Sequence, residues 1–209
     1  MNDHEVIFEQ TPVGSYRNFS YLVADRATRL ATIFDPAWEV ESLYSRIKNY
    51  ELTLKYIINT HSHFDHIEGN QELKNRTGAL IIMNEFSLAM KDIAVKDDES
   101  LSLGKNLTMK FLHTPGHSPD SMCTIVNDSC MITGDTLFVG ECGRVDLPGG
   151  DAGALFESFK KIKSLDEDLV IYPGHDYGAK SSSTLGEQIR TNYTLAPRDK
   201  DEFIKFMRE

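Results

Sequence analysis

Residues 60–70 read THSHFDHIEGN and directly follow the apolar run LKYIIN, which has the composition of a buried strand. Four side chains in this stretch are able to hold a metal: His61, His63, Asp65 and His66. His61 and His63 are two apart, so on an extended segment their side chains point the same way. Asp65 and His66 follow where the chain leaves the strand and a helix begins. Because imidazoles and carboxylates at such spacing are typical of metal or catalytic sites, the pattern predicts that the first pair faces one metal ion and the second pair another.

Three further polar residues follow predicted strands elsewhere in the chain. His117 lies in HTPGHSPDS, Asp135 in MITGDTLF and His175 in IYPGHDYG, each at or just past the end of a strand. Since strand-to-loop junctions can converge at one edge of a sheet, we expect these residues to complete the site. The other two histidines do not fit this pattern: His4 lies near the N-terminus, and His113 is expected to be a turn residue or a neighbour of the ligands.

The hydrophobic pattern predicts two groups of strands with helices between and after them. Strands are expected at 5–10, 18–24, 30–35, 55–60 and 79–83, and again at 107–115, 122–127, 130–135 and 168–174. Helices are expected at 39–50, 66–76, 84–91 and 154–162, with two short ones at 184–192 and 200–209. No linker or repeat interrupts the pattern. We therefore expect one domain over 1–209, a sandwich of two sheets with outer helices, and a helical tail from about 184.

Composition limits the classes of function. The chain has 40% hydrophobic and 26% charged residues, which is typical of a soluble globular protein. A net charge of -10 repels phosphate backbones and anionic lipid, so neither nucleic acid nor a membrane is an expected partner. The start, MNDHEVIFEQTPVG, does not resemble a signal peptide, and no window has the roughly 18 continuous apolar residues of a membrane span. Cys123, Cys130 and Cys142 lack C-x-x-C spacing, which favours reduced thiols in the cytoplasm.

The motifs H-x-H-x-D-H, TPGHSPDS, TGDTLF and YPGHDY, in this order and at these separations, resemble the metallo-β-lactamase-fold superfamily. The resemblance extends from the first strands to about residue 190 and implies an αββα four-layer sandwich with the site at one edge. It implies two divalent metal ions, of zinc, iron or manganese. The resemblance assigns the first metal to His61, His63 and His117, and the second metal to Asp65, His66 and His175. It assigns Asp135 as the bridge between the two metals.

Two such ions make a nucleophile from water at neutral pH and stabilise an oxyanion, so the resemblance implies hydrolysis of an activated acyl substrate such as a thioester. Asp65 is also a candidate to receive or orient a proton, and Asp135 positions both metals. These two aspartates are therefore the predicted catalytic residues.

The segment GECGRVDLPGGD (140–151) resembles glyoxalase II (hydroxyacylglutathione hydrolase) and its relatives, in which a C-G-R or C-G-K segment helps to hold glutathione. Arg144 is accordingly the candidate for binding a substrate carboxylate, since its guanidinium fork suits that group. The alternative is a structural salt bridge with Asp146 or Asp151. Tyr177 matches a family position that also contacts glutathione, and its alternative role is that of a packed core tyrosine.

Other features resemble the persulfide dioxygenases: IYPGHDYGAKSSSTLGEQIRTN followed by DEFIKFM, and the pattern CGR-x-D that ends at Asp146. Those relatives use one iron, at the positions of His61, His117 and Asp135, to oxidise glutathione persulfide to sulfite. Two histidines and one carboxylate on one face suit non-haem Fe(II). Glyoxalase II also carries a further C-terminal helical domain, whereas only about twenty residues follow Arg190 here.

Three functions therefore stay open: a dinuclear hydrolase, a mononuclear iron persulfide dioxygenase, and a non-catalytic metal or partner-binding module. Seven ligands favour the hydrolase, because they support a two-metal mechanism without further assumption. The expected partner is a small thiol-derived substrate such as a glutathione conjugate. The apolar residues Phe203, Ile204 and Phe206 of the tail are candidates to cover either the core or a second copy in a homodimer.

Overall fold

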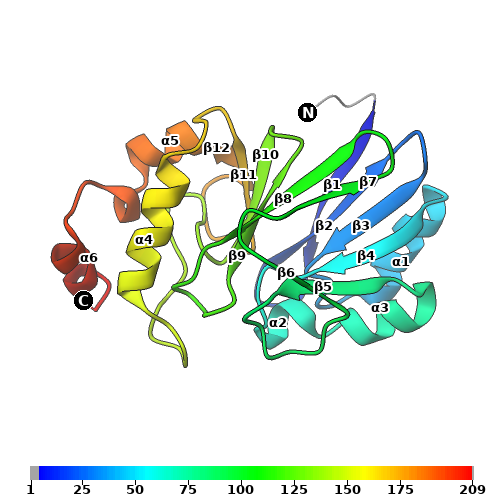
Figure 1. Ribbon diagram of the computed structural model, residues 1–209, viewed down its shortest axis with the longest axis horizontal. Coiled ribbons are helices and arrows are strands. Elements are labelled where there is room, and N and C mark those ends of the chain that lie inside the picture. The colour runs from blue at the N-terminus through cyan, green and yellow to red at the C-terminus, as the bar shows by residue number, and fades with distance from the viewer. Residues whose placement is uncertain (1–4, 209) are drawn as a thin grey trace.

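The computed structural model describes residues 5–208 and contains two six-stranded sheets packed face to face (Figure 1). The first sheet has the order β1 (Val6–Val13), β2 (Asn18–Asp25), β3 (Leu30–Phe34), β4 (Thr53–Ile58), β5 (Leu80–Asn84) and β6 (Ile93–Val95). The second has the order β12 (Ser183–Thr184), β11 (Val170–Pro173), β10 (Cys130–Gly134), β9 (Met122–Val126), β8 (Leu107–His113) and β7 (Ser100–Leu103). Neighbouring strands from β3 to β6 are parallel, as are β10 and β11.

Helices cover the outer face of each sheet, which confirms the predicted αββα sandwich (Figure 1). On the first sheet lie α1 (Val40–Asn49) and α3 (Asn70–Thr77), and the short α2 (Phe64–Ile67) precedes α3. On the second lie α4 (Ala152–Lys163), α5 (Leu185–Thr191), the 3₁₀ turn η1 (Tyr193–Leu195) and α6 (Lys200–Phe206). None of the helices between residues 5 and 208 is long and apolar enough to cross a membrane.

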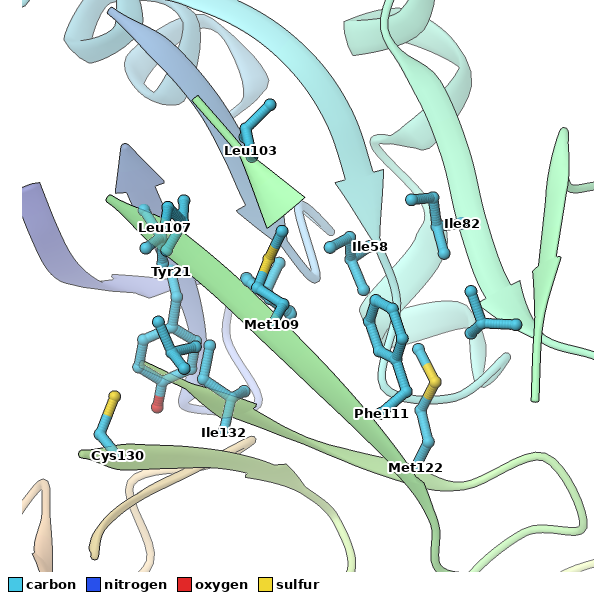
Figure 2. Close-up of a cluster of buried hydrophobic side chains, with 14 of the residues drawn as sticks. Tyr21, Ile58, Ile82, Leu103, Leu107, Met109, Phe111, Met122, Cys130 and Ile132 are labelled. Atoms are coloured by element: carbon cyan, nitrogen blue, oxygen red, sulfur yellow. The ribbon is translucent and has the colours of Figure 1, made fainter. Parts of the chain in front are cut away.

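The space between the sheets is filled by side chains from alternate strand positions (Figure 2). Tyr21 and Ile58 reach in from the first sheet, and Met109, Phe111 and Ile132 from the second. Burying a side chain of this size stabilises the fold by roughly 1.5–3 kcal/mol. The hydroxyl of Tyr21 also donates a hydrogen bond to the carbonyl oxygen at the end of β11, so the sheets are joined by a polar contact as well as an apolar one.

The helical tail lies where the sequence predicts it. α5 and α6 fall within the expected ranges 184–192 and 200–209, and Asp199 caps α6 with a full capping box. Phe203 is buried against Phe159 of α4, with ring centroids 5.7 Å apart. This residue of the tail therefore covers the core of its own chain.

The helix predicted over 84–91 is wrong, because β5 continues to Asn84 and an irregular loop follows it. The Asn84 side chain accepts a hydrogen bond from the N–H of Phe86 at 3.0 Å, and Ser87 Oγ accepts one from the N–H two residues later at 3.3 Å. Side chains of this kind offer the backbone an alternative to helical bonding. The large apolar residues of the loop are consequently exposed, and Leu88 is 100% exposed.

Two smaller differences have local causes. The predicted helix 66–76 is divided into α2 and α3 at Gly69, where a Cβ would lie 2.0 Å from the carbonyl oxygen of Pro36. The sequence pattern does not predict strands β6, β7 and β12, because they have only three, four and two residues and show little apolar alternation. All three cysteines are buried and free, as the sequence predicts.

Asp25, the last residue of β2, joins the two sheets through hydrogen bonds. Its carboxylate accepts from the hydroxyl of Thr28, from the N–H of Lys105 at 2.9 Å and from Nδ2 of Asn106 at 2.9 Å. The last two residues belong to the turn between β7 and β8. Burial alone would raise the pKa of Asp25, but these hydrogen bonds, led by that of Thr28, lower it from 3.8 to about 2.

We expect Asp25→Asn to lower the free energy of unfolding at pH 7 by about 2 kcal/mol, because hydrogen bonds to a charged acceptor are lost. A carboxylate whose pKa is lower in the folded state contributes its stability above about pH 4 and loses it as the pH falls toward 2. Urea unfolding of both proteins should therefore show a smaller difference at pH 3 than at pH 7. Asp128→Asn, at an exposed turn position with φ 48°, is the control. It should leave the free energy of unfolding unchanged at both pH 3 and pH 7.

Candidate metal centre

Each predicted ligand lies in the segment that follows a strand, and the structure brings all seven together at one edge of the sandwich. His61 and His63 follow β4, and Asp65 and His66 stand on α2 immediately after them. The other three come from the second sheet: His117 follows β8, Asp135 follows β10 and His175 follows β11. Two sheets thus contribute donors to the same place.

The first set of donors is His61, His63 and His117. Nδ1 of His63 lies 3.0 Å from Nε2 of His61 and 2.9 Å from Nε2 of His117. Two ligand atoms about 2.1 Å from one ion at a tetrahedral angle are about 3.4 Å apart. The three nitrogens therefore need to separate by only a few tenths of an ångström to hold an ion.

The second set is Asp65, His66 and His175. Nε2 of His66 lies 3.3 Å from Nε2 of His175, and Oδ2 of Asp65 is 3.5 Å from the latter. Asp135 lies between the sets: its Oδ2 is 3.5 Å from Nε2 of His117 and 3.2 Å from Nε2 of His175. This carboxylate occupies the bridging position that the sequence motif implies.

The protonation of these groups suits a divalent cation. Burial lowers the pKa of His61 well below its ordinary value and also lowers that of His63, so both imidazoles present lone pairs. Burial would raise the pKa of Asp135, but His66 and His175 outweigh it and hold that pKa well below its ordinary value. Oδ1 of Asp135 is buried without a hydrogen-bond partner. The neutral imidazoles of His61 and His63 and the ionised carboxylate of Asp135 fit a divalent cation, because each of them offers lone pairs to it.

The ring nitrogens that face away from the cluster donate to oxygen atoms, which fixes the tautomers of four histidines. The contacts are His61 Nδ1 to Thr60 Oγ1 at 3.1 Å, His66 Nδ1 to Asp35 Oδ2 at 3.0 Å, His117 Nδ1 to the Arg144 carbonyl at 2.9 Å, and His175 Nδ1 to the Tyr16 carbonyl at 2.9 Å. The other nitrogen of each of these rings therefore faces the cluster.

Asp35 is a functional residue that the sequence patterns above do not single out. It is buried, and it accepts hydrogen bonds from the N–H of Thr60 at 2.8 Å, from the hydroxyl of Thr60 at 2.7 Å and from His66 Nδ1 at 3.0 Å. Because the hydroxyl of Thr60 donates to Asp35, it accepts from His61. One carboxylate thus orients a histidine of each set. The available signal is its place in LATIFD, a polar residue directly after an apolar strand.

The side chain of Arg144 forms an ion pair with a neighbouring residue of its own loop. Its Nε and Nη2 donate to the two carboxylate oxygens of Asp146, both at 2.6 Å, and this pair is exposed. Arg144 lowers the pKa of Asp146 to about 2. The structure thus contains the salt bridge that was the alternative for Arg144, with Asp146 rather than Asp151 as the partner.

Tyr177 lies beside the second set of ligands. Its ring stacks on His175, with centroids 4.7 Å apart and an angle of 8° between the planes, and it is 48% exposed. The alternative of a packed core tyrosine is therefore wrong. Phe64, which stands between two ligands in the sequence, is 59% exposed and meets the rings of Tyr16 and Trp38, so aromatic surface also borders the cluster.

We expect Asp35→Asn to weaken metal binding by about 10–100-fold, the usual cost of losing a group that orients a metal ligand. Asparagine tolerates the left-handed backbone at this position, where φ is 46°. The measurement is competition between a chelator and the metal-loaded protein, followed by elemental analysis. Asp25→Asn makes the same change at another buried carboxylate and should leave metal retention unaltered. Equal retention in the two variants would contradict the role of Asp35.

Comparison with known proteins agrees with this geometry. Residues 14–175 match the model of the metallo-beta-lactamase superfamily. The human mitochondrial persulfide dioxygenase ETHE1 is 36% identical over 196 residues, which cover 90% of this chain and 75% of that protein. A hydroxyacylglutathione hydrolase of Pelagibacter ubique is 36% identical over 169 residues, which cover 79% of this chain and 69% of that protein.

Among solved structures, that of ETHE1 from Myxococcus xanthus matches with a TM-score of 0.91 and 32% identity, over 97% of this chain and 90% of that one. Membership of one family therefore explains the two sheets, the site at their common edge and the order of the ligands. The chain belongs to the metallo-β-lactamase superfamily of enzymes.

Proposed function

We propose that the protein is a metal-dependent hydrolase of the glyoxalase II type, which cleaves a thioester or a similarly activated acyl substrate with two metal ions. The position of Asp135 carries this proposal. Its carboxylate oxygens lie within 3.2–3.5 Å of His66, His117 and His175, and so reach donors of both sets. Since this residue can serve two ions at once, the donor set supports two-metal chemistry with only small shifts of the ligands.

The residues divide between two ions. His61, His63 and His117 would hold one, Asp65, His66 and His175 would hold the other, and Asp135 would serve both. When bound, two divalent cations lower the pKa of a water molecule and polarise the acyl carbonyl. Zinc and iron are both compatible with imidazole and carboxylate donors.

Asp65 is the residue we assign to proton transfer. Its side chain is partly exposed, and its Oδ2 accepts a hydrogen bond from Nδ2 of Asn18 at 3.1 Å. Asn18 also donates to the backbone oxygen of Asp65 at 2.9 Å, so the carboxylate is held in one orientation. A carboxylate placed this way can take the proton of the attacking water and return it to the leaving thiolate.

We assign binding of the thiol carrier to Arg144 and Tyr177. The Arg144–Asp146 pair is exposed, and exposed pairs contribute little, so a substrate carboxylate can take the place of Asp146. The exposed ring of Tyr177 offers an aromatic surface beside His175. A small thiol with free carboxylates, such as glutathione, fits these two groups.

A persulfide dioxygenase is the second candidate, because the identity to ETHE1 equals that to the hydrolase at 36%. One iron at His61, His117 and Asp135 would suffice for it. The two functions make different demands on the second set of ligands, which the hydrolase needs and the dioxygenase does not.

We expect His175→Ala to reduce thioester hydrolysis by at least about a hundredfold and to lower the metal content from near two ions per chain to near one. The measurements are elemental mass spectrometry, hydrolysis of acyl-glutathione and oxygen uptake with glutathione persulfide, each on wild type and variant. A wild type that consumes oxygen but hydrolyses no thioester, with a variant that retains this oxygen uptake, would show the dioxygenase instead.

We expect Arg144→Ala to raise KM for a glutathione-bearing substrate about tenfold with little change in kcat, as for loss of a contact made equally in the ground and transition states. Arg190→Ala is the matched control, since Arg190 of α5 also forms an exposed ion pair, with Glu167. An unchanged KM in the Arg144 variant would remove this residue from the substrate site.

A further inference from the structure

A cavity of about 660 Å³ lies next to the first set of ligands. Ser62, which stands between two of those histidines in the sequence, lines it, and so does Gly116, which immediately precedes His117. No metal ligand lines the cavity itself, but chain neighbours of all three histidines of the first set do. Its volume lies within the range of about 300–1,000 Å³ that is usual for small-molecule sites.

The walls of the cavity are mainly apolar. Phe86 and Leu88 come from the loop after β5, and they face Pro148 and the ring of His113. The ring of Phe86 stacks on that of His113, with centroids 4.9 Å apart. His113 Nε2 donates a hydrogen bond to the carbonyl of Pro119 at 2.8 Å, which holds the two stacked rings in place. Phe86 is 56% and Leu88 100% exposed. Exposed apolar groups that gather beside a cavity mark a ligand surface.

The only charged side chains that line the cavity, within the part of the chain that the structure describes, are acidic. Asp120 accepts from the hydroxyl of Ser118 at 2.7 Å, and Asp151 accepts from the N–H of Ala154 at 3.0 Å as the cap of α4. Both carboxylates disfavour an anionic ligand and leave an apolar, neutral one as the chemical match.

A second cavity, of about 990 Å³, adjoins the first, since Asp151 lines both. Arg144 lines this second cavity, together with the tail residues Phe206 and Met207. A thioester also has two arms, the acyl chain and the thiol carrier. The two cavities provide one place for each. The lining of the larger cavity, the place for the carrier, has two arginines, Arg144 and Arg208, beside three carboxylates, whereas no lysine or arginine of the described residues lines the smaller cavity.

We infer that the smaller cavity binds the acyl chain of the substrate, and that this chain is apolar, uncharged and several carbons long. The inference rests on the proposed hydrolase function and names its substrate class. Phe86 and Leu88 are then the residues that set the preference for chain length, while activation of the water belongs to the metal ligands.

The test is binding of straight-chain carboxylates, the products of such a hydrolysis, to the zinc-loaded protein by titration calorimetry. From acetate to octanoate we expect affinity to increase about threefold for each added methylene, the effect of burying that group. Suberate has the length of octanoate with a second carboxylate, and it should bind at least about tenfold more weakly because the acidic residues repel it.

The variants Phe86→Ala and Leu88→Ala should each reduce the gain from acetate to octanoate, and the double variant should abolish it. Leu80→Ala, at the exposed start of β5 and outside the cavity, is the matched control and should behave as wild type. Equal affinity for acetate and octanoate in the wild type, or a full gain in the double variant, would overturn the inference.

Turnover of acetyl- to octanoyl-glutathione separates this inference from the proposed function. Hydrolysis that is independent of chain length would contradict the cavity assignment and leave the hydrolase standing. No hydrolysis of any thioester, with the affinity gain for octanoate intact, would overturn the hydrolase and still support an apolar ligand in this cavity.

Discussion

The buried carboxylate of Asp35 is the constraint on which the site depends. A carboxylate removed from water is stable only when its oxygens accept hydrogen bonds. Here the donors are the N–H and hydroxyl of Thr60 and the ring of His66. Asp35 follows β3, whereas its donors follow β4 and lie on α2, so the charge is satisfied only when all three segments meet. His61 takes its orientation from the same hydroxyl. The contacts that stabilise this edge of the fold are therefore the same contacts that orient the metal ligands.

The same arrangement explains why the centre favours a cation. Burial opposes a charge on His66, but Asp135 and Asp35 outweigh it and raise the pKa of His66 well above its ordinary value. A positive charge is thus stabilised between two carboxylates in the interior. A divalent ion would meet that requirement as well, because the carboxylate of Asp135 and the surrounding imidazoles are all ligand groups for such a cation.

The ligands were predictable because their residue types are rare at the ends of apolar strands, and because four of them lie within six residues. The role of Asp35 was not predictable, since a lone aspartate before Pro36 is also typical of an ordinary turn. The loop after β5 was predicted wrongly for a related reason. Phe86 and Leu88 have apolar side chains, but they line a cavity instead of the core, and sequence spacing does not distinguish the two. The choice of Asp146 over Asp151 by Arg144 likewise depends on loop geometry.

The ligand set favours a two-metal hydrolase, but it is also compatible with the dioxygenase. Relatives of either kind share 36% of the residues they align with, and one donor set is compatible with both chemistries. The discriminating features must then be groups that touch the substrate or determine whether the second ion is held. Tyr177 borders the ligands of that second ion, and the loop of Phe86 borders the first. In this fold the strand ends determine where a water can be activated, and the side chains of the surrounding loops determine which molecule it meets.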